Sequence, residues 1–424
     1  MKQPQLAIDQ LRDAVLRMPQ NKLSARRTAA VAKLKKNGLP TLRHEDWKYT
    51  DLEPAVSISN RWLATGASNL VSDALLQHAA TIKQTIDADW LVIANGALDT
   101  RGISDLGDIT FELLSESHET EVTNWPLADL NAALLNDGLR IQIHAATEKP
   151  LGILVVDAAE ASPSVSQIHV ELEIAAGCDA EVIEYHSSIG NEGSYCNSIV
   201  SLSIGESARA SYVRVQDRHI EHTQTARLSV TIGAAGDLQM ASFDLGGGLI
   251  RNDVDIDLSE PGANAGFDGL YLAGDGQHID NHTRVDHRVG PAKSSQEYRG
   301  ILNGRCRCVW NGKAVVHKGA DGTDANQANH NLLLSNKAEI DAKPELEIYA
   351  DEVKCSHGTT VGQLDESAIY YLRTRGMDKR QAIEVLTRAF GAGLVNRIPI
   401  STARDAIGAL VEKRLAEIIQ DQPQ

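Results

Sequence analysis

One feature limits the fold of this chain more than any other: a strand-like unit that repeats from about residue 141 onward. Each unit contains a segment in which apolar and polar residues alternate, a turn of Gly, Ala or Pro, and a second alternating segment. The first segment of such a unit lies at residues 169–174, 198–204 and 227–232. The turns recur at about 28 residues, and a fixed period in this range indicates a solenoid. Because the units hold no helical pattern, we expect a β-helix-like stack of coils.

The composition is compatible with thin repeated layers. Aromatic residues make up only 4% of the chain, so small and β-branched side chains must fill the interior. A hydrophobic content of 42% is enough for a folded core. The formal net charge of −16 argues against a nucleic-acid partner and against an anionic membrane surface. No run of about 18 apolar residues occurs, so we expect no membrane-spanning helix.

The first residues and the cysteine content favour a cytoplasmic protein. Residues 1–20 hold Asp9 and Asp13 among short apolar runs, which is not the pattern of a signal peptide. The five cysteines are odd in number and thinly spread, as in proteins of a reducing compartment.

Changes in patterning predict three domains. We expect a helical or mixed N-terminal domain over residues 1–140, a β-helix core over 141–364 and a helical C-terminal domain over 365–424. Within the first domain, residue spacing predicts helices over 3–18, 24–36, 70–86 and 126–136 and a strand over 90–95. The polar segment 42–50 is predicted to be a loop pinned by Trp47 and Tyr49. Asp378 and Gln381 form a candidate capping box at the start of a C-terminal helix.

The C-terminal segment holds two amphipathic helices, with apolar stripes along residues 382–394 and 407–419. Such helices can cap the end of a solenoid, or they can dock a partner. The sequence leaves both interpretations open. The candidate partner-binding residues are Val385, Leu386, Phe390, Ile407, Leu410 and Val411.

The candidate site of greatest interest lies in the stretch 344–362. Cys355 and His357 are two residues apart in an extended segment, so their side chains point to the same face. Sulfur and imidazole are both ligands for iron, zinc or a sulfur-bearing intermediate. A closed metal site needs about four ligands, so the others must come from another strand or another chain. The alternative is a buried cysteine beside a histidine that is hydrogen-bonded to the backbone.

Three further patterns have two interpretations each. Cys306 and Cys308 could form a thiol site with a lowered pKa beside Arg305, but one cysteine on each face of a strand is favoured. The Asn and Gln residues of 319–334 could form a polar ligand site that includes His330, but a ladder or turn inside the coil is favoured. Residues 253–257 place three aspartates on one face, which resembles the carboxylate cluster of a β-helix carbohydrate enzyme.

Residues 343–358 and 370–376 closely resemble the SufB/SufD family of iron–sulfur cluster assembly proteins. Two segments are similar to the SufD branch of this family: residues 45–52 near the N-terminus, and residues 331–334, which are an asparagine followed by three leucines. The SufB pattern has a cysteine just before the position of Leu332, whereas this chain has Asn329, His330 and Asn331 there. The SufB pattern also has an acidic residue at the position where this chain has Gly358. The departures from the SufD pattern are small and lie at Glu352 and Thr359.

This resemblance implies a right-handed parallel β-helix between an N-terminal and a C-terminal helical domain. It implies a scaffold subunit rather than an enzyme, in a complex with a SufB-like paralogue and the SufC-like ABC ATPase, which would dock on the C-terminal helices. A transient iron–sulfur cluster or iron would form at the SufB–SufD interface, with His357 facing a SufB cysteine and Cys355 as a second candidate ligand. A sulfur donor would act indirectly, and flavin on the complex and a homodimer of the chain alone stay open. The chain has no G-x-x-x-x-G-K-[ST] loop, so nucleotide would act through the partner.

Two rival functions remain. The first is a carbohydrate-active β-helix enzyme that uses the aspartates of 253–257. The second is a purely structural brace for SufB that carries no ligand, which differs from the favoured function only at Cys355 and His357.

Overall fold

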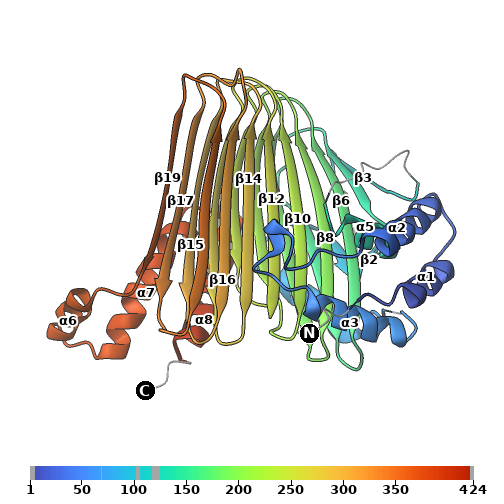
Figure 1. Ribbon diagram of the computed structural model, residues 1–424, viewed down its shortest axis with the longest axis horizontal. Coiled ribbons are helices and arrows are strands. Elements are labelled where there is room, and N and C mark those ends of the chain that lie inside the picture. Colours follow the sequence, from blue (N-terminus) through green and yellow to red (C-terminus); the bar gives the residue numbers. More distant parts are fainter. Residues whose placement is uncertain (1–4, 68, 102–105, 117–124, 421–424) are drawn as a thin grey trace.

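The computed structural model describes residues 5–67, 69–101, 106–116 and 125–420. Its centre is a solenoid in which successive strands alternate between two long sheets, as Figure 1 shows. The first sheet, sheet A, contains in spatial order β19 (Lys354–Gly362), β17 (Asp324–Leu333), β15 (Lys293–Leu302), β13 (Asn264–Ala273), β11 (Asp237–Asp244), β9 (Arg209–Asp217), β7 (Asp179–Gly190), β5 (Leu151–Ala159), β1 (Asp89–Ala94) and β2 (Ala97–Asp99). The second sheet, sheet B, contains β18 (Glu339–Ile348), β16 (Arg307–Val316), β14 (His278–His287), β12 (Leu249–Leu258), β10 (Thr223–Ile232), β8 (Ser194–Ile204), β6 (Ser164–Ile174), β4 (Leu139–Ile143) and β3 (Ile109–Leu113).

The strands from β4 onward stack in parallel, which confirms the predicted β-helix. Thr223 pairs with Tyr195 on one side and Leu249 on the other, at separations of 28 and 26 residues along the chain. Arg307 pairs with Glu339 at a separation of 32 residues, so the period is variable. The predicted strand 90–95 is β1, which pairs in parallel with β5 and therefore joins sheet A.

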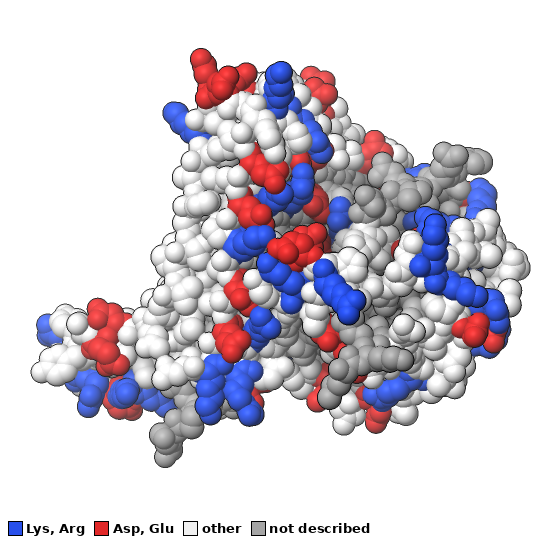
Figure 2. Space-filling view, viewed as in Figure 1, with Lys and Arg blue, Asp and Glu red and all other residues white. Residues whose placement is uncertain are grey.

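Alternation within each strand places apolar residues inside the coil. On β12, Val254, Ile256 and Leu258 are buried, whereas the intervening aspartates face outward and are partly exposed. Each of these aspartates has a cationic partner: Asp253 lies 2.7 Å from Arg251, Asp255 lies 2.9 Å from Arg227 and Asp257 lies 3.0 Å from Arg288. Figure 2 shows a column of acidic and basic side chains along the solenoid. This pairing neutralises the carboxylates that the enzyme interpretation requires.

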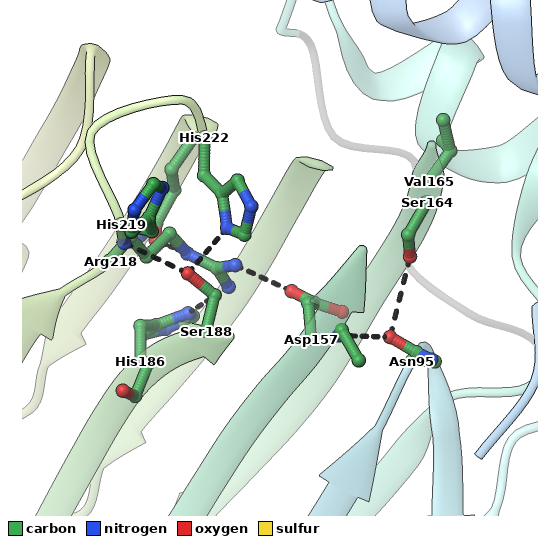
Figure 3. Close-up of polar contacts among 12 residues, drawn as sticks. Asn95, Asp157, Ser164, Val165, His186, Ser188, Arg218, His219 and His222 are labelled. Atoms are coloured by element: carbon green, nitrogen blue, oxygen red, sulfur yellow. Dashed lines mark hydrogen bonds and ion pairs between the residues drawn. The ribbon is translucent and has the colours of Figure 1, made fainter. Parts of the chain in front are cut away.

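The interior also contains a polar cluster that the sequence analysis did not predict. Arg218 is 1% exposed and donates from Nη1 to Asp157 Oδ2 at 2.6 Å and from Nε to Gln224 Oε1 at 2.6 Å. Its Nη2 lies 3.5 Å from His186 Nδ1, and His222 Nδ1 lies 2.5 Å from the hydroxyl of Ser188 on β7 (Figure 3). These contacts connect successive coils where apolar layers would otherwise stack.

Helices cover the outer faces of both sheets. On sheet B, the cluster of α1 (Ile8–Arg17), α2 (Ser24–Asn37), α3 (Glu53–Ala64) and α5 (Ala128–Leu134) packs against β6 and β8. On sheet A, α4 (Asp73–Lys83), α7 (Lys379–Val395) and α8 (Ser401–Gln420) pack against the strands, and the short α6 (Glu366–Thr374) projects away at the left of Figure 1. Among the described residues, no helix is both long and apolar enough to cross a membrane.

The predicted loop 42–50 crosses sheet B and contains only a short 3-10 helix, η1 (Glu45–Trp47). Trp47 is buried beneath the guanidinium of Arg251, which lies 4.5 Å from its ring centroid. Thr50 forms hydrogen bonds with His278 and Asp280 on β14. These contacts confirm that the loop is pinned to the solenoid. The capping box predicted at Asp378 is also present at the start of α7.

Candidate functional site

The two ends of the solenoid differ in how they are closed. At the N-terminal end, β2 pairs antiparallel with β1, β3 pairs antiparallel with β4, and helices pack beside them. At the other end, β18 and β19 are the last strands of their sheets, and no described strand pairs beyond them. The last coil therefore presents both its interior and its free backbone edges.

Burial changes abruptly at this last coil. On β17, the inward-facing Ala325, Gln327 and Asn329 are at most 4% exposed. Their register partners on β19 are Cys355, His357 and Thr359, and none of these is buried. The inward residues of β16 are likewise buried, whereas every residue of β18 is at least partly exposed. The interior of the last coil is thus exposed, because no strand of the described residues stacks on it.

Cys355 and His357 lie together on this open end. Their pairing with Ala325 and Gln327 places both on the inward side of β19, which confirms the prediction that they share a face. Cys355 is partly exposed, and its pKa is raised above the usual value by burial. His357 is exposed and has no hydrogen-bond partner among the described residues. Lys354 lies on the outer side and does not share the face of the thiol.

A polar floor lies beneath the pair. Gln327 spans the coil: its amide donates to the Gly312 carbonyl at 3.0 Å and accepts from the Ala314 N–H at 2.9 Å, in the orientation that satisfies both groups. Asn329 and Asn331 bond to each other at 2.6 Å, and Asn329 donates to the Tyr271 hydroxyl at 3.1 Å. These contacts satisfy the polar side chains inside the coil, as the favoured interpretation requires, but the Asn–Asn bond lies within β17 rather than between stacked coils.

His330 does not belong to this floor. It lies on the outer side of β17, where Nδ1 is 2.9 Å from the hydroxyl of Thr360 on β19. The alternative of a polar ligand site that includes His330 therefore finds no support in the geometry.

The ligand set at the open end is incomplete. In the part of the chain that the structure describes, no group of three or more His, Cys, Asp or Glu side chains could hold a metal ion. Cys355 and His357 supply two donor atoms, and iron or zinc bound by protein side chains ordinarily takes about four ligands. A metal or cluster at this position would need donors from a second chain.

The rim of the open end is apolar on the inward side of β18, whereas the charged residues of that strand lie on its outer side. Ile348 and Val361 are 43% and 54% exposed, and Ile340 and Leu346 are partly exposed beside them. This end of the molecule is largely white in Figure 2, next to the column of acidic and basic side chains. An exposed edge strand with apolar neighbours is a template for pairing with another chain, and natural proteins usually block such edges.

The prediction for Cys306 and Cys308 was wrong. The favoured interpretation put one cysteine on each face of a strand, but both side chains are buried, at 2% and 0% exposure. Cys306 precedes β16 in the turn, where strand alternation does not apply, and Cys308 lies within β16, fully buried inside the coil.

The residues proposed to bind a partner through the C-terminal helices have different surroundings. Ile407 and Val411 are 1% and 2% exposed because α8 packs them against sheet A. Leu386, Phe390 and Leu410 are partly buried, and Val385 is 42% exposed. Two tyrosines that the sequence analysis did not single out as partner contacts, Tyr370 and Tyr371, are 69% and 57% exposed on α6.

Comparison with known proteins identifies the family. A family model described as "SUF system FeS cluster assembly, SufBD core domain" matches residues 155–390, and one described as "SufBD protein N-terminal region" matches residues 7–62. The iron–sulfur cluster assembly protein SufD of Escherichia coli (strain K12) is 28% identical over 394 residues, which cover 90% of each chain. An iron–sulfur cluster assembly SufBD family protein of Synechocystis is 27% identical over 89% of this chain and 87% of its own. SufD of Bacillus subtilis (strain 168) is 26% identical over 70% of this chain and 68% of its own. Because the core match spans more than half of a chain with this parallel β-solenoid, the protein belongs to the SufB/SufD family of the SUF system for iron–sulfur cluster assembly.

Proposed function

We propose that this chain is a scaffold subunit that joins a SufB-like paralogue through the open end of its solenoid, and that an iron–sulfur cluster is assembled at the junction. The observation that carries the proposal is the exposed last coil, whose inward face holds Cys355 and His357. A second β-solenoid placed against β18 and β19 would bury the apolar rim and pair the free edges. It would also bring in the donor atoms that this chain lacks.

His357 is suited to such a role because its ring is accessible and unpaired within the described residues. A neutral imidazole binds iron through one nitrogen, and near neutral pH it can also accept or release a proton. Cys355 has a raised pKa in the isolated chain, so its thiol is mostly protonated at neutral pH. We therefore assign the larger role to His357 and expect Cys355 to bind iron or sulfur only when a bound cation stabilises its thiolate.

The C-terminal helices are the proposed docking site for a SufC-like ATPase. Of the six apolar residues named from the sequence, Val385 is the exposed one, and α6 adds the exposed Tyr370 and Tyr371. α7 also contacts β15 and β13 of sheet A, which lie two and three strands from the edge strand β19. A movement of α7 driven by ATP hydrolysis on the partner would therefore act on the same sheet that ends in β19.

The test uses this chain co-expressed with its cognate SufB-like and SufC-like partners. Iron and acid-labile sulfide are measured in the purified complex for the wild type, His357→Ala and His330→Ala. His330 is a matched control because it lies on the neighbouring strand but faces outward. We expect cluster content to fall strongly in His357→Ala alone, at unchanged subunit ratio. Equal cluster content in all three complexes would reduce this chain to a structural brace.

A further inference from the structure

A groove lies in the N-terminal part of the molecule, between α1, the C-terminal end of α2 and the start of α3, which stand at the right of Figure 1. Its cavity volume is about 1740 Å³. Pockets that enclose a small molecule measure about 300–1,000 Å³, so this groove is larger than such a ligand needs. Its lining includes neither β18 and β19 nor the C-terminal helices, so the groove is separate from both interfaces proposed above.

The floor of the groove is apolar. Leu34, Leu52 and Val56 line it and are at most 5% exposed, because they belong to the core of the N-terminal helical cluster. Leu39 is partly buried against the same core, and Leu42 is 44% exposed. The groove therefore offers apolar side chains to a ligand on the outer side of a packed core.

The α2 side of the groove is basic. Residues 24–44 contain six Lys and Arg residues and no Asp or Glu, although the whole chain has a formal net charge of −16. Three of the six, Lys35, Lys36 and Arg43, line the groove and are exposed. None of these three forms an ion pair within the described residues, whereas Lys33 on the same helix lies 3.6 Å from Asp129. The basic side is thus left with charge that the chain does not neutralise.

Helix ends explain only part of this charge pattern. Lys35 and Lys36 lie in the last turn of α2, where the helix dipole favours cations. Arg43 lies in the loop beyond α2, so the dipole does not account for it. Asp51 and Glu53 also line the groove, and Asp51 Oδ1 accepts from the Glu53 N–H at 3.0 Å at the start of α3. The carboxylate of Asp51 is therefore engaged within its own segment.

We propose that this groove binds an amphipathic helix of a partner protein, in which acidic residues flank an apolar stripe. The stripe would cover the apolar floor, and the carboxylates would lie against Lys35, Lys36 and Arg43. Insertion of a helix into an apolar groove is a common mode of protein recognition. Complementary charge makes such binding faster and sensitive to salt. The excess of acidic charge on this chain disfavours a second copy as the occupant.

The test measures the affinity of the full-length chain for a fluorescent peptide of about 18 residues, with Leu at the i, i+3 and i+4 spacing of one helix face and Glu on the other. A second peptide carries Lys in place of Glu. We expect the acidic peptide to bind at least about tenfold more tightly than the basic one, and to weaken as salt screens the charges. Equal affinities of the two peptides would overturn the proposal.

Matched variants test the basic side. Lys36→Glu combined with Arg43→Glu should weaken binding of the acidic peptide at least about tenfold. Lys33→Glu combined with Lys318→Glu changes the net charge by the same amount, but Lys33 already has a partner and Lys318 lies beyond β16. We expect this control to change the Kd less than about threefold. All four side chains are exposed, so both double variants should fold.

Amide hydrogen exchange with the acidic peptide bound locates the contact. We expect slower exchange over residues 34–43 and 51–56 and unchanged exchange over β18 and β19. Protection of the open end or of the C-terminal helices instead would overturn the proposal, as would equal weakening by the two double variants. So would a dimer of the free chain in light scattering that the Lys36→Glu and Arg43→Glu variant abolishes, because a second copy would then occupy the groove.

Discussion

The interior of this solenoid contains a buried pair of opposite charges. Arg218 and Asp157 are both fully buried and lie 2.6 Å apart, so each compensates the desolvation of the other. Breaking such a pair from one side leaves an uncompensated charge and costs about 3–5 kcal/mol. We therefore expect Asp157→Asn to lower the free energy of unfolding by about that amount in urea denaturation. The exposed pair Arg305–Asp275 is the control, and Asp275→Asn should leave the midpoint nearly unchanged. Equal effects of the two variants would contradict a special role for the buried pair.

Asp255 gives the stability a defined pH dependence. Burial raises its pKa to about 6, although Arg227 opposes the shift. An unfolded aspartate titrates at about 3.9, so the folded state binds the proton first as the pH falls. Because the carboxyl pKa is higher in the folded state, the free energy of unfolding increases as the pH falls from about 7 to about 4. In parallel urea titrations at pH 7 and pH 5, the wild type should gain stability on acidification relative to Asp255→Asn. The same pH dependence in both proteins would show that Asp255 does not titrate in this range.

At the scale of elements, the inward side chains of β19 form part of the surface that the open end presents to a partner. Thr359 faces the coil interior and Thr360 faces outward, so the two adjacent threonines form a matched pair. We expect Thr359→Asp to weaken association with the SufB-like paralogue at least about tenfold, because a carboxylate would be buried without a partner. Thr360→Asp should change the Kd far less, since it alters only the contact with His330. Equal weakening by both variants would place the interface on the outer face instead.

Strand alternation explains how much of these elements the sequence could predict. The spacing of Val254, Ile256 and Leu258 gives the inward face of β12, and the same rule places Cys355 and His357 on one side of β19. The rule fails for Cys306, because it holds within strands and Cys306 lies in a turn. It also cannot give register between coils. That Gln327 lies under His357 depends on a turn length that differs from coil to coil.

The same limit applies to the helices and the interior charges. An apolar stripe predicts that a helix face is buried, but Ile407 and Val411 pack on their own sheet rather than on a partner. Arg218 and Asp157 are 61 residues apart in sequence, so no local pattern could reveal their pairing.

At the scale of the whole molecule, the proposed partners occupy different places. The SufB-like subunit would cover the last coil, and the ATPase would bind the C-terminal helices. We expect Val385→Asp to reduce co-purification of the SufC-like subunit while the SufB-like subunit is retained. Leu16→Asp is the control, because Leu16 is 67% exposed on α1 and packs beside neither proposed interface. Retention of the ATPase in Val385→Asp would exclude this face of α7 as its docking site.

The central claim is that the open end of the solenoid is the surface on which a second subunit completes the assembly site. Amide hydrogen exchange tests it most directly, in the chain alone and in complex with its SufB-like paralogue. The account predicts slower exchange in the complex over β18 and β19, with little change over β10 and β12 within the stack. Unchanged exchange at β18 and β19, with protection elsewhere, would contradict it.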